Sequence, residues 1–199
     1  MSISGRLDDS GHDLALTRIV PVPAAQIWEH VSRSDGLATW YGTFSGDPAT
    51  GTVQVTMTAE PGEAVAAEYT IHDCEPERLL TVSSSMGEGA WRLSLELAPA
   101  TSADAATILD GTATLDATAT LDGTVTLGGM ADGAASAGST QVVLCHHDVP
   151  LEMLAYVGPG WEWYLDRLTG AVTGGPIPGM DVWDSQYMTL SQEYADLAS

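Results

Sequence analysis

Residues 158–168 read GPGWEWYLDRL, and this stretch decides the fold. Its opening Gly-Pro-Gly is typical of a helix start, and Trp161, Leu165 and Leu168 follow at positions i, i+4 and i+7, which lie on one side of a helix. An apolar stripe of this size needs a partner that covers it. Because the chain before it consists mostly of short alternating segments, we expect the helix to lie across a β-sheet and to close its core.

The sheet is expected from apolar residues that recur with a period of two. Residues 14–20 predict a first strand that Pro21 ends, and residues 24–32 and 34–41 then predict two short helices. The alternation further along predicts strands at residues 53–57, 65–71, 78–85, 91–97 and 140–146. The turns between the first four of these are too short for parallel crossovers, so we expect an antiparallel meander.

A length of 199 residues fits one domain with one core. We expect a flexible N-terminus at residues 1–11, a main domain at 12–170, and a Pro/Gly linker with an amphipathic C-terminal helix at 171–199 that packs on the domain. Residues 101–139 stand apart, because residues 109–126 hold three hexapeptides of the form Leu-Asp-Gly/Ala-Thr-Ala/Val-Thr. Their alternation predicts an elongated hairpin or mobile arm inserted into the main domain, with disorder as the alternative.

Composition excludes several classes of partner. The net charge is −21, with six arginines and no lysine, whereas nucleic acids and anionic membranes attract clustered cations. We therefore expect no nucleic-acid and no membrane partner. The two cysteines are too few for a disulfide scaffold, no apolar run approaches the ~20 residues of a membrane span, and the first residues lack an apolar signal core. Together these features predict a cytoplasmic protein.

The order of strand, two short helices, meander and long helix is accompanied by four short motifs. These are PAAQIW at residues 23–28, GLATWY at 36–41, EPERL at 75–79 and GWEWYLDRL at 160–168. Together they resemble the START-like (SRPBCC, helix-grip) superfamily, and within it the branch of homologues of the activator of heat-shock protein 90 ATPase. The resemblance covers about residues 12–170 except 101–139. It implies an α+β fold in which an antiparallel sheet wraps around a long C-terminal helix, with two short helices after the first strand.

The resemblance also implies a cavity between sheet and helix that takes an apolar small molecule. The residues expected to bind this ligand are Met57, Tyr69, Trp91, Leu93, Leu95, Trp161, Leu165 and Leu168. Two other functions stay open: an enzyme of the polyketide cyclase or aromatase type that uses the same cavity, and a protein-interaction module such as a co-chaperone. A homodimer and a chaperone partner are also left open, the latter without support in the sequence.

A zinc site is suggested by His72 and Cys74 on one strand and by Cys145 and His147 on another. In the family's strand order two strands separate these pairs, which leaves roughly 14 Å at ~4.8 Å per strand, whereas metal–ligand bonds are ~2 Å long. We therefore expect no metal site and no cofactor.

Catalysis is the remaining question for the polar residues. His146, His147 and Asp148 at a strand end could serve acid–base chemistry, but no Ser or Cys nucleophile stands in a recognisable motif. We therefore expect no catalytic residue. An enzyme would need a polar group in the cavity wall, and Tyr69, Arg92 or His146 could supply one only if they face inward.

Overall fold

The structure, a computed structural model, describes residues 2–62, 64–84, 91–101 and 138–198. The hexapeptide repeat and nearly all of the insertion expected at residues 101–139 lie outside the described residues. Among the helices of the described part, none is long and apolar enough to span a lipid bilayer.

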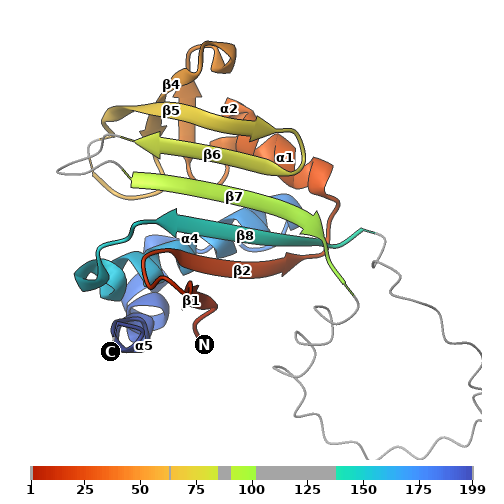
Figure 1. Cartoon of the computed structure of the whole chain (residues 1–199). Helices are drawn as coiled ribbons and strands as arrows, with labels where there is room; N and C mark the ends of the chain where they lie inside the picture. The colour runs from red at the N-terminus through yellow and green to blue at the C-terminus, as the bar shows by residue number, and fades with distance from the viewer. Residues whose placement is uncertain (1, 63, 85–90, 102–137, 199) are drawn as a thin grey trace, which may run out of the picture.

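One eight-stranded antiparallel sheet is the framework of the fold, with the strand order β1-β2-β8-β7-β6-β5-β4-β3 (Figure 1). Its strands are β1 Gly5–Leu7, β2 Leu14–Val20, β3 Gly42–Ser45, β4 Thr52–Met57, β5 Ala66–Glu75, β6 Leu79–Ser84, β7 Trp91–Pro99 and β8 Thr140–His147. Strands β3 to β7 form the meander, and β8 pairs with both β7 and β2. The predicted meander is confirmed and is one strand longer than expected, because β3 is too short to show an alternating pattern.

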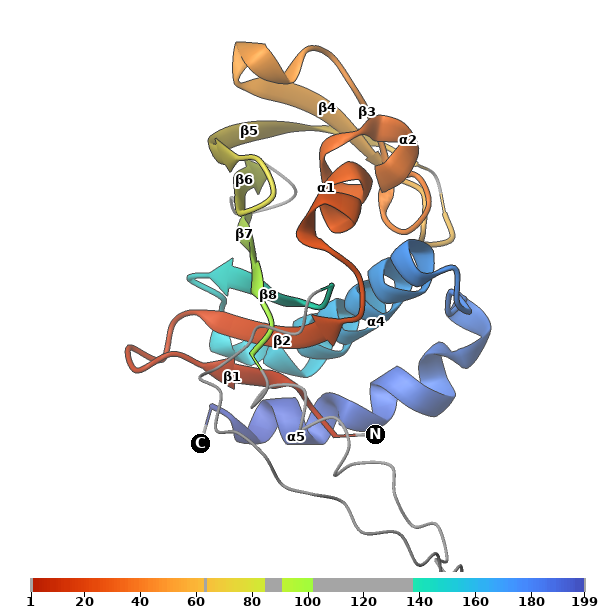
Figure 2. The same ribbon diagram turned by 90° about the vertical axis from the view of Figure 1, so that its right-hand side faces the viewer.

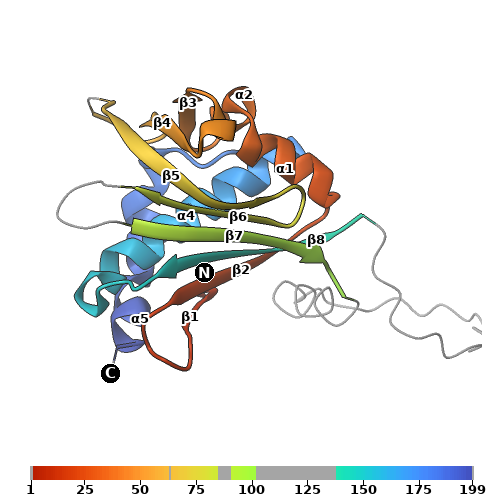
Figure 3. The ribbon, with the colours of Figure 1, turned by 45° about the horizontal axis from the view of Figure 1, so that its top comes forward.

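Three helices are held by this sheet. Helices α1 (Ala24–Ser32) and α2 (Ser34–Leu37) follow β2, and the long helix α4 (Leu154–Thr173) follows β8. Figures 2 and 3 show the sheet curving so that all three helices lie on its concave side. This is the α+β helix-grip architecture that the sequence predicts.

The apolar stripe of α4 faces the sheet. Trp161, Leu165 and Leu168 are 5%, 2% and 1% exposed, and they belong to one core cluster with Leu16 of β2 and Leu144 of β8. At ~25 cal/mol per Å² of apolar surface removed from water, large side chains buried to this extent each stabilise the fold by about 1.5–3 kcal/mol. Burial of the stripe is therefore what attaches α4 to the sheet.

A buried carboxylate adds a polar anchor to the same helix. Glu162 is fully buried, and it pairs with Arg18 of β2 and accepts hydrogen bonds from the Tyr194 hydroxyl at 2.6 Å and from the Ser4 amide at 2.6 Å. A buried charge is tolerated when it is paired and its lone pairs are satisfied. Glu162 thus links α4 to β2 through Arg18, to the N-terminal segment through Ser4 and to the C-terminal segment through Tyr194.

The start of α4 differs from the prediction. The helix begins at Leu154, ahead of the Gly-Pro-Gly motif, and Pro159 lies inside it. A proline there removes one backbone hydrogen bond and disfavours a helix by about 3 kcal/mol. Leu154 and Val157 are both buried and extend the stripe by i, i+3 and i+7 to Trp161, so their packing outweighs the proline.

The N-terminal prediction is wrong for residues 5–7. They form β1, which pairs with β2 in the register Gly5↔Leu16 to Leu7↔Leu14. Gly5 is buried against the Tyr194 ring, whose atoms lie 2.6 Å from where a Cβ would stand. Three residues are too few to show an apolar pattern, and backbone pairing, one close approach and the partial burial of Leu7 hold the strand.

The C-terminal segment is less regular than the single helix predicted for it. Its first part comprises 3₁₀ turns at Met180–Val182 and Met188–Leu190 with a π-helical turn at Trp183–Tyr187 between them, and α5 covers only Ser191–Asp196. Tyr187, Leu190 and Tyr194, whose spacing in the sequence predicts one apolar face of a helix, are nonetheless buried. The changing helical pitch lets these three side chains reach the core from a segment that starts after the break at residues 174–179.

Candidate functional site: a cavity between the sheet and helix α4

Two adjoining hollows lie on the concave side of the sheet, the larger against α4 and the smaller against α1 and α2. The larger has a volume of about 740 Å³ and the smaller about 160 Å³. Tyr41, Tyr69 and Trp161 line both of them and so form the wall that they share. The position agrees with the cavity that the family resemblance implies.

The larger cavity reaches the surface between the β4–β5 loop and the beginning of α4. Val65 of the loop and Tyr156 of the helix both line it, and they are 71% and 68% exposed, so they stand at its rim. Further in, the wall is rich in aromatic side chains. Its aromatic members besides the shared three are Trp91, Trp163, Tyr164 and Trp183.

The smaller cavity lies between α1 and the sheet and has an almost wholly apolar wall. Helix α1 and the segment after it contribute Val31, Leu37 and Trp40, while the sheet contributes the other side. The sheet residues, besides the shared Tyr69, are Phe44, Val53, Val55, Ile71, Cys74, Leu80, Val82, Leu93, Leu95 and Leu144. A group that enters this space is held by shape and burial alone.

One polar cluster interrupts the apolar surface. The hydroxyls of Tyr41 and Tyr69 lie 2.9 Å apart, and the Tyr164 hydroxyl donates to Oε1 of Glu60 at 2.7 Å. The rings of Tyr41 and Tyr164 are 5.0 Å apart, so the two pairs adjoin. Burial raises the pKa of Tyr41 and, together with the hydrogen bond to Glu60, the pKa of Tyr164, so both phenols stay protonated and can donate hydrogen bonds.

His146 supports the tryptophans of the wall without lining either cavity. It is 2% exposed, its Nδ1 accepts a hydrogen bond from Nε1 of Trp161 at 3.2 Å, and its ring centroid lies 4.8 Å from that of Trp91. Burial, reinforced by neighbouring His147, lowers the pKa of His146 to about 4, with Asp13 acting the other way. The imidazole is therefore neutral at pH 7 and fixes the orientation of Trp161.

The structure distributes the predicted ligand residues over both cavities. Met57 and Trp91 line the larger one, Leu93 and Leu95 the smaller one, and Tyr69 and Trp161 both. The remaining two, Leu165 and Leu168, are placed differently from the prediction. They belong to the buried core cluster with Leu16 and Leu144 and line neither cavity.

The three polar residues considered for the cavity wall occupy different positions. Tyr69 faces inward and lines the cavities, and His146 faces inward behind the tryptophans. Arg92 is exposed and pairs in register with His147, on the convex face. The sequence missed Glu60 and Tyr164, although Tyr164 follows Trp161 by three residues, a spacing that places both on one side of a helix.

The strand argument against a four-residue zinc site is confirmed. His72 and Cys74 lie on β5, Cys145 and His147 on β8, and β6 and β7 run between them. These two pairs do not meet.

Comparison with known proteins supports the fold. No protein-family model and no curated protein matches this sequence. Among solved structures, CalU16 from Micromonospora echinospora is 20% identical with a TM-score of 0.59, over 99% of this chain and 96% of that chain. A protein from Bordetella parapertussis is 18% identical with a TM-score of 0.63, over 97% and 90%. A third, from Nitrosomonas europaea, is 15% identical with a TM-score of 0.55, over 84% and 97%.

The class of fold that the structure defines is the α+β helix grip, and membership of the START-like (SRPBCC) superfamily stays a prediction. Sequence identities of 20% and below show that the fold is shared. The activity must be inferred from the residues of the site. The narrower assignment to the branch of homologues of the activator of heat-shock protein 90 ATPase stays a prediction.

Proposed function

We propose that this protein binds a small, mainly apolar molecule in the cavity between the sheet and α4. The observation that carries the proposal is the larger cavity itself, because about 740 Å³ falls within the ~300–1,000 Å³ of small-molecule sites. Its wall is rich in aromatic side chains, and it shares Tyr41, Tyr69 and Trp161 with the smaller apolar cavity. Burial at ~25 cal/mol per Å² would provide most of the affinity.

The polar cluster narrows the chemistry of the ligand. The phenols of Tyr41, Tyr69 and Tyr164 can bind a hydroxyl or carbonyl group, and Glu60 accepts hydrogen bonds. A carboxylate in the wall, within a protein of net charge −21, disfavours anionic ligands. We expect neutral aromatic ligands with one or two hydroxyl or carbonyl groups to bind more tightly than fatty acids of equal size.

The test is a titration with fatty acids, flavonoids and polycyclic aromatics. Saturable quenching of tryptophan emission and a raised melting temperature are expected, because a ligand that binds only the native state stabilises it by about 2.7 kcal/mol at 100 times its Kd. Four tryptophans line the larger cavity, namely Trp91, Trp161, Trp163 and Trp183.

Gly160 offers a size-graded control for the location of the site. It lies in the wall on α4, and a Cβ there would meet nothing within 4 Å. Gly160→Leu should fill part of the cavity and weaken binding by at least about tenfold, which is about 1.4 kcal/mol. Gly160→Ala should bind nearly as the parent does. Equal affinity in the leucine variant would place the ligand elsewhere.

An enzyme of the polyketide cyclase or aromatase type is the second candidate. The Tyr164–Glu60 hydrogen bond favours it, because an exposed carboxylate that a phenol holds at the edge of the cavity can accept a proton from a bound ligand. Conversion of a bound panel member by the parent but not by Glu60→Gln, with binding retained in both, would establish catalysis. If no panel member binds, the protein-interaction module becomes the better proposal.

A further inference from the structure

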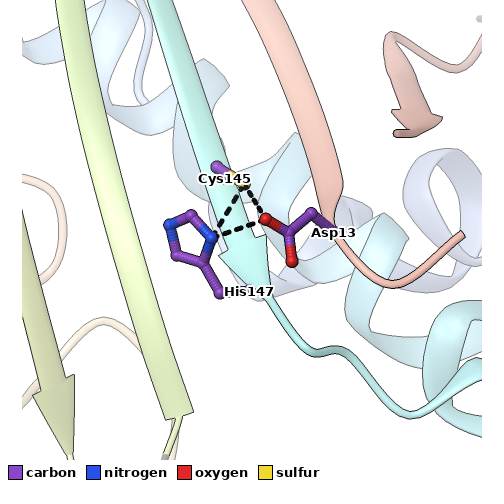
Figure 4. A group of neighbouring side chains, drawn as sticks. All are labelled: Asp13, Cys145 and His147. Carbon is purple, nitrogen blue, oxygen red and sulfur yellow. Dashed lines mark hydrogen bonds and ion pairs between the residues drawn. The ribbon is translucent and has the colours of Figure 1, made fainter. Parts of the chain in front are cut away.

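We propose that Asp13, Cys145 and His147 form a binding site for a divalent transition metal ion, Zn²⁺ before others, on the convex face of the sheet. This site is separate from the ligand cavity. Figure 4 shows the three side chains converging, with Cys145 and His147 on β8 and Asp13 directly before β2.

Strand pairing brings the three residues together. Along β8 the even-numbered residues Leu144 and His146 are buried on the concave side, so Cys145 and His147 point to the other face. Leu14 pairs with His146, which places Asp13 beside His147 on that same face. A residue that lies 132 positions away in the sequence thereby completes the Cys-x-His pair.

The distances suit a tetrahedral ion. Sγ of Cys145 lies 3.6 Å from Nδ1 of His147 and 3.8 Å from Oδ2 of Asp13. Zinc bonds of ~2.0–2.3 Å at tetrahedral angles separate neighbouring sulfur and nitrogen or oxygen ligands by about 3.6 Å. Nδ1 and Oδ2 are now hydrogen-bonded at 2.7 Å, so this one separation must open by about 0.6 Å on metal binding.

The outer partners of the cluster also match those of metal sites. Nε2 of His147 lies 2.9 Å from Oγ of Ser94, and the other oxygen of Asp13 accepts the Asp148 amide at 3.0 Å. Such contacts orient metal ligands and typically change affinity by ~10–100-fold. His147 and Asp13 are 25% and 31% exposed, which leaves a fourth position open to water.

The ligand types point to zinc. Thiolate, imidazole and carboxylate together suit a borderline ion, whereas Mg²⁺ and Ca²⁺ take oxygen ligands.

Two catalytic interpretations of the same residues fit less well. Cys145 and Asp13 both contact Nδ1 of His147, so the imidazole does not relay a proton between them. Ser94, His147 and Asp13 do stand in series. Ser94 is only 5% exposed inside a flat strand, however, which keeps its hydroxyl from a substrate carbonyl.

The test uses the full-length protein, treated with chelator, kept reduced and titrated with Co²⁺ as a spectroscopic probe and with Zn²⁺ in competition. One equivalent of Co²⁺ should give a thiolate-to-cobalt charge-transfer band and the visible bands of a tetrahedral ion, and Zn²⁺ should displace it. Absence of stoichiometric binding of either ion overturns the proposal.

The chain offers matched controls. Cys145→Ser should abolish the charge-transfer band and Cys74→Ser, at the exposed second cysteine, should not. His147→Gln should weaken binding while His72→Gln should leave it unchanged, although His72 contacts a strand serine in the same way, with Nε2 2.8 Å from Oγ of Ser83.

Variants of Asp13 and Ser94 test the third ligand and the residue that orients His147. Asp13→Asn should lower the affinity for Zn²⁺ at least tenfold, and Ser94→Ala should lower it by about 10-fold or more without removing the charge-transfer band. Near-ultraviolet circular dichroism of each metal-free variant checks its fold. Should Cys145→Ser not fold, the cobalt spectrum of the parent decides, because the charge-transfer band requires a thiolate and persists in Cys74→Ser only if Cys145 supplies it. Equal binding by the variant and control of either pair contradicts the site.

Discussion

At the scale of single residues, the two histidines that end β8 show how one step along a strand changes the chemistry. His146 points to the concave side, where Trp161 and Trp91 surround it, and His147 points to the convex side, toward Asp13 and Ser94. The first is a buried neutral acceptor and the second is a partly exposed donor or ligand. Because successive side chains of a strand point to opposite faces, two histidines that are adjacent in sequence have different surroundings.

His146 should make the stability of the protein fall in mild acid. Its pKa is lowered from 6.5 to about 4 in the fold, so the unfolded chain binds the proton more readily between these values. The contribution is fully present above about pH 6.5 and is lost as pH falls toward 4. The contribution of His146 to the free energy of unfolding is on the order of 3 kcal/mol.

Urea unfolding of the parent and of His146→Gln between pH 7 and 4.5 measures this contribution. Glutamine can accept the Trp161 hydrogen bond and does not titrate in this range. The carboxylates, including Asp13, act in both proteins and cancel in the difference. Parallel curves of unfolding free energy against pH would show that His146 is not buried in a neutral state.

At the scale of elements, two of the three glycines of α4, Gly158 and Gly160, have opposite surroundings. A Cβ on Gly158 would lie 2.2 Å from Cδ1 of Tyr194, whereas on Gly160 it would lie in open space. Gly158 is therefore the point at which the segment carrying α5 crosses α4. The sequence shows both glycines next to Pro159 and makes no distinction between them.

Alanine at these two positions should change stability in opposite directions. Gly160→Ala should stabilise the protein by up to about 1 kcal/mol, the difference in helix propensity. Gly158→Ala has the same propensity gain but displaces a buried tyrosine, and overpacking of this kind typically costs 1–3 kcal/mol. Denaturant melts of both variants beside the parent test the pair, and a stabilised Gly158→Ala would mean that Tyr194 does not pack on α4.

At the scale of the whole molecule, the ends of the insertion are adjacent. Pro99 at the end of β7 pairs with Thr140 at the start of β8, and the Ala100 amide donates to the Ser139 carbonyl at 3.0 Å. The sheet therefore continues on both sides of residues 103–137, and its register does not depend on a long connection. A short turn can join the two strands at this point.

Replacing residues 103–137 with a short Gly-Ser turn should leave a cooperatively folding protein. Loop closure should favour the shortened chain by about 1–2 kcal/mol, since each doubling of loop length costs about 0.6 kcal/mol. Thermal and denaturant melts, with mass measurement in solution, test this. Loss of cooperative unfolding would make the insertion part of the core, and a changed oligomeric mass in a folded protein would make it an association segment.

The sequence by itself determined the local elements and the class of fold. Period-two alternation predicted β2 with the bounds that the structure has, and the stripe at Trp161, Leu165 and Leu168 predicted the helix that closes the core. These signals are local, because burial on one face imposes a repeat that a short window of sequence displays. The motifs around them then indicated the helix grip.

Only the tertiary structure decided which residues share a site. Glu60 meets Tyr164 and Asp13 meets Cys145 and His147 across separations of more than a hundred residues, and β1 forms on backbone pairing without an apolar pattern. Whether Leu165 lines a cavity or fills a core depends on the spacing between α4 and the sheet, which the whole packed assembly sets. Periodicity specifies the face of an element, while contact requires the register and curvature of its partners, and these are properties of the folded chain.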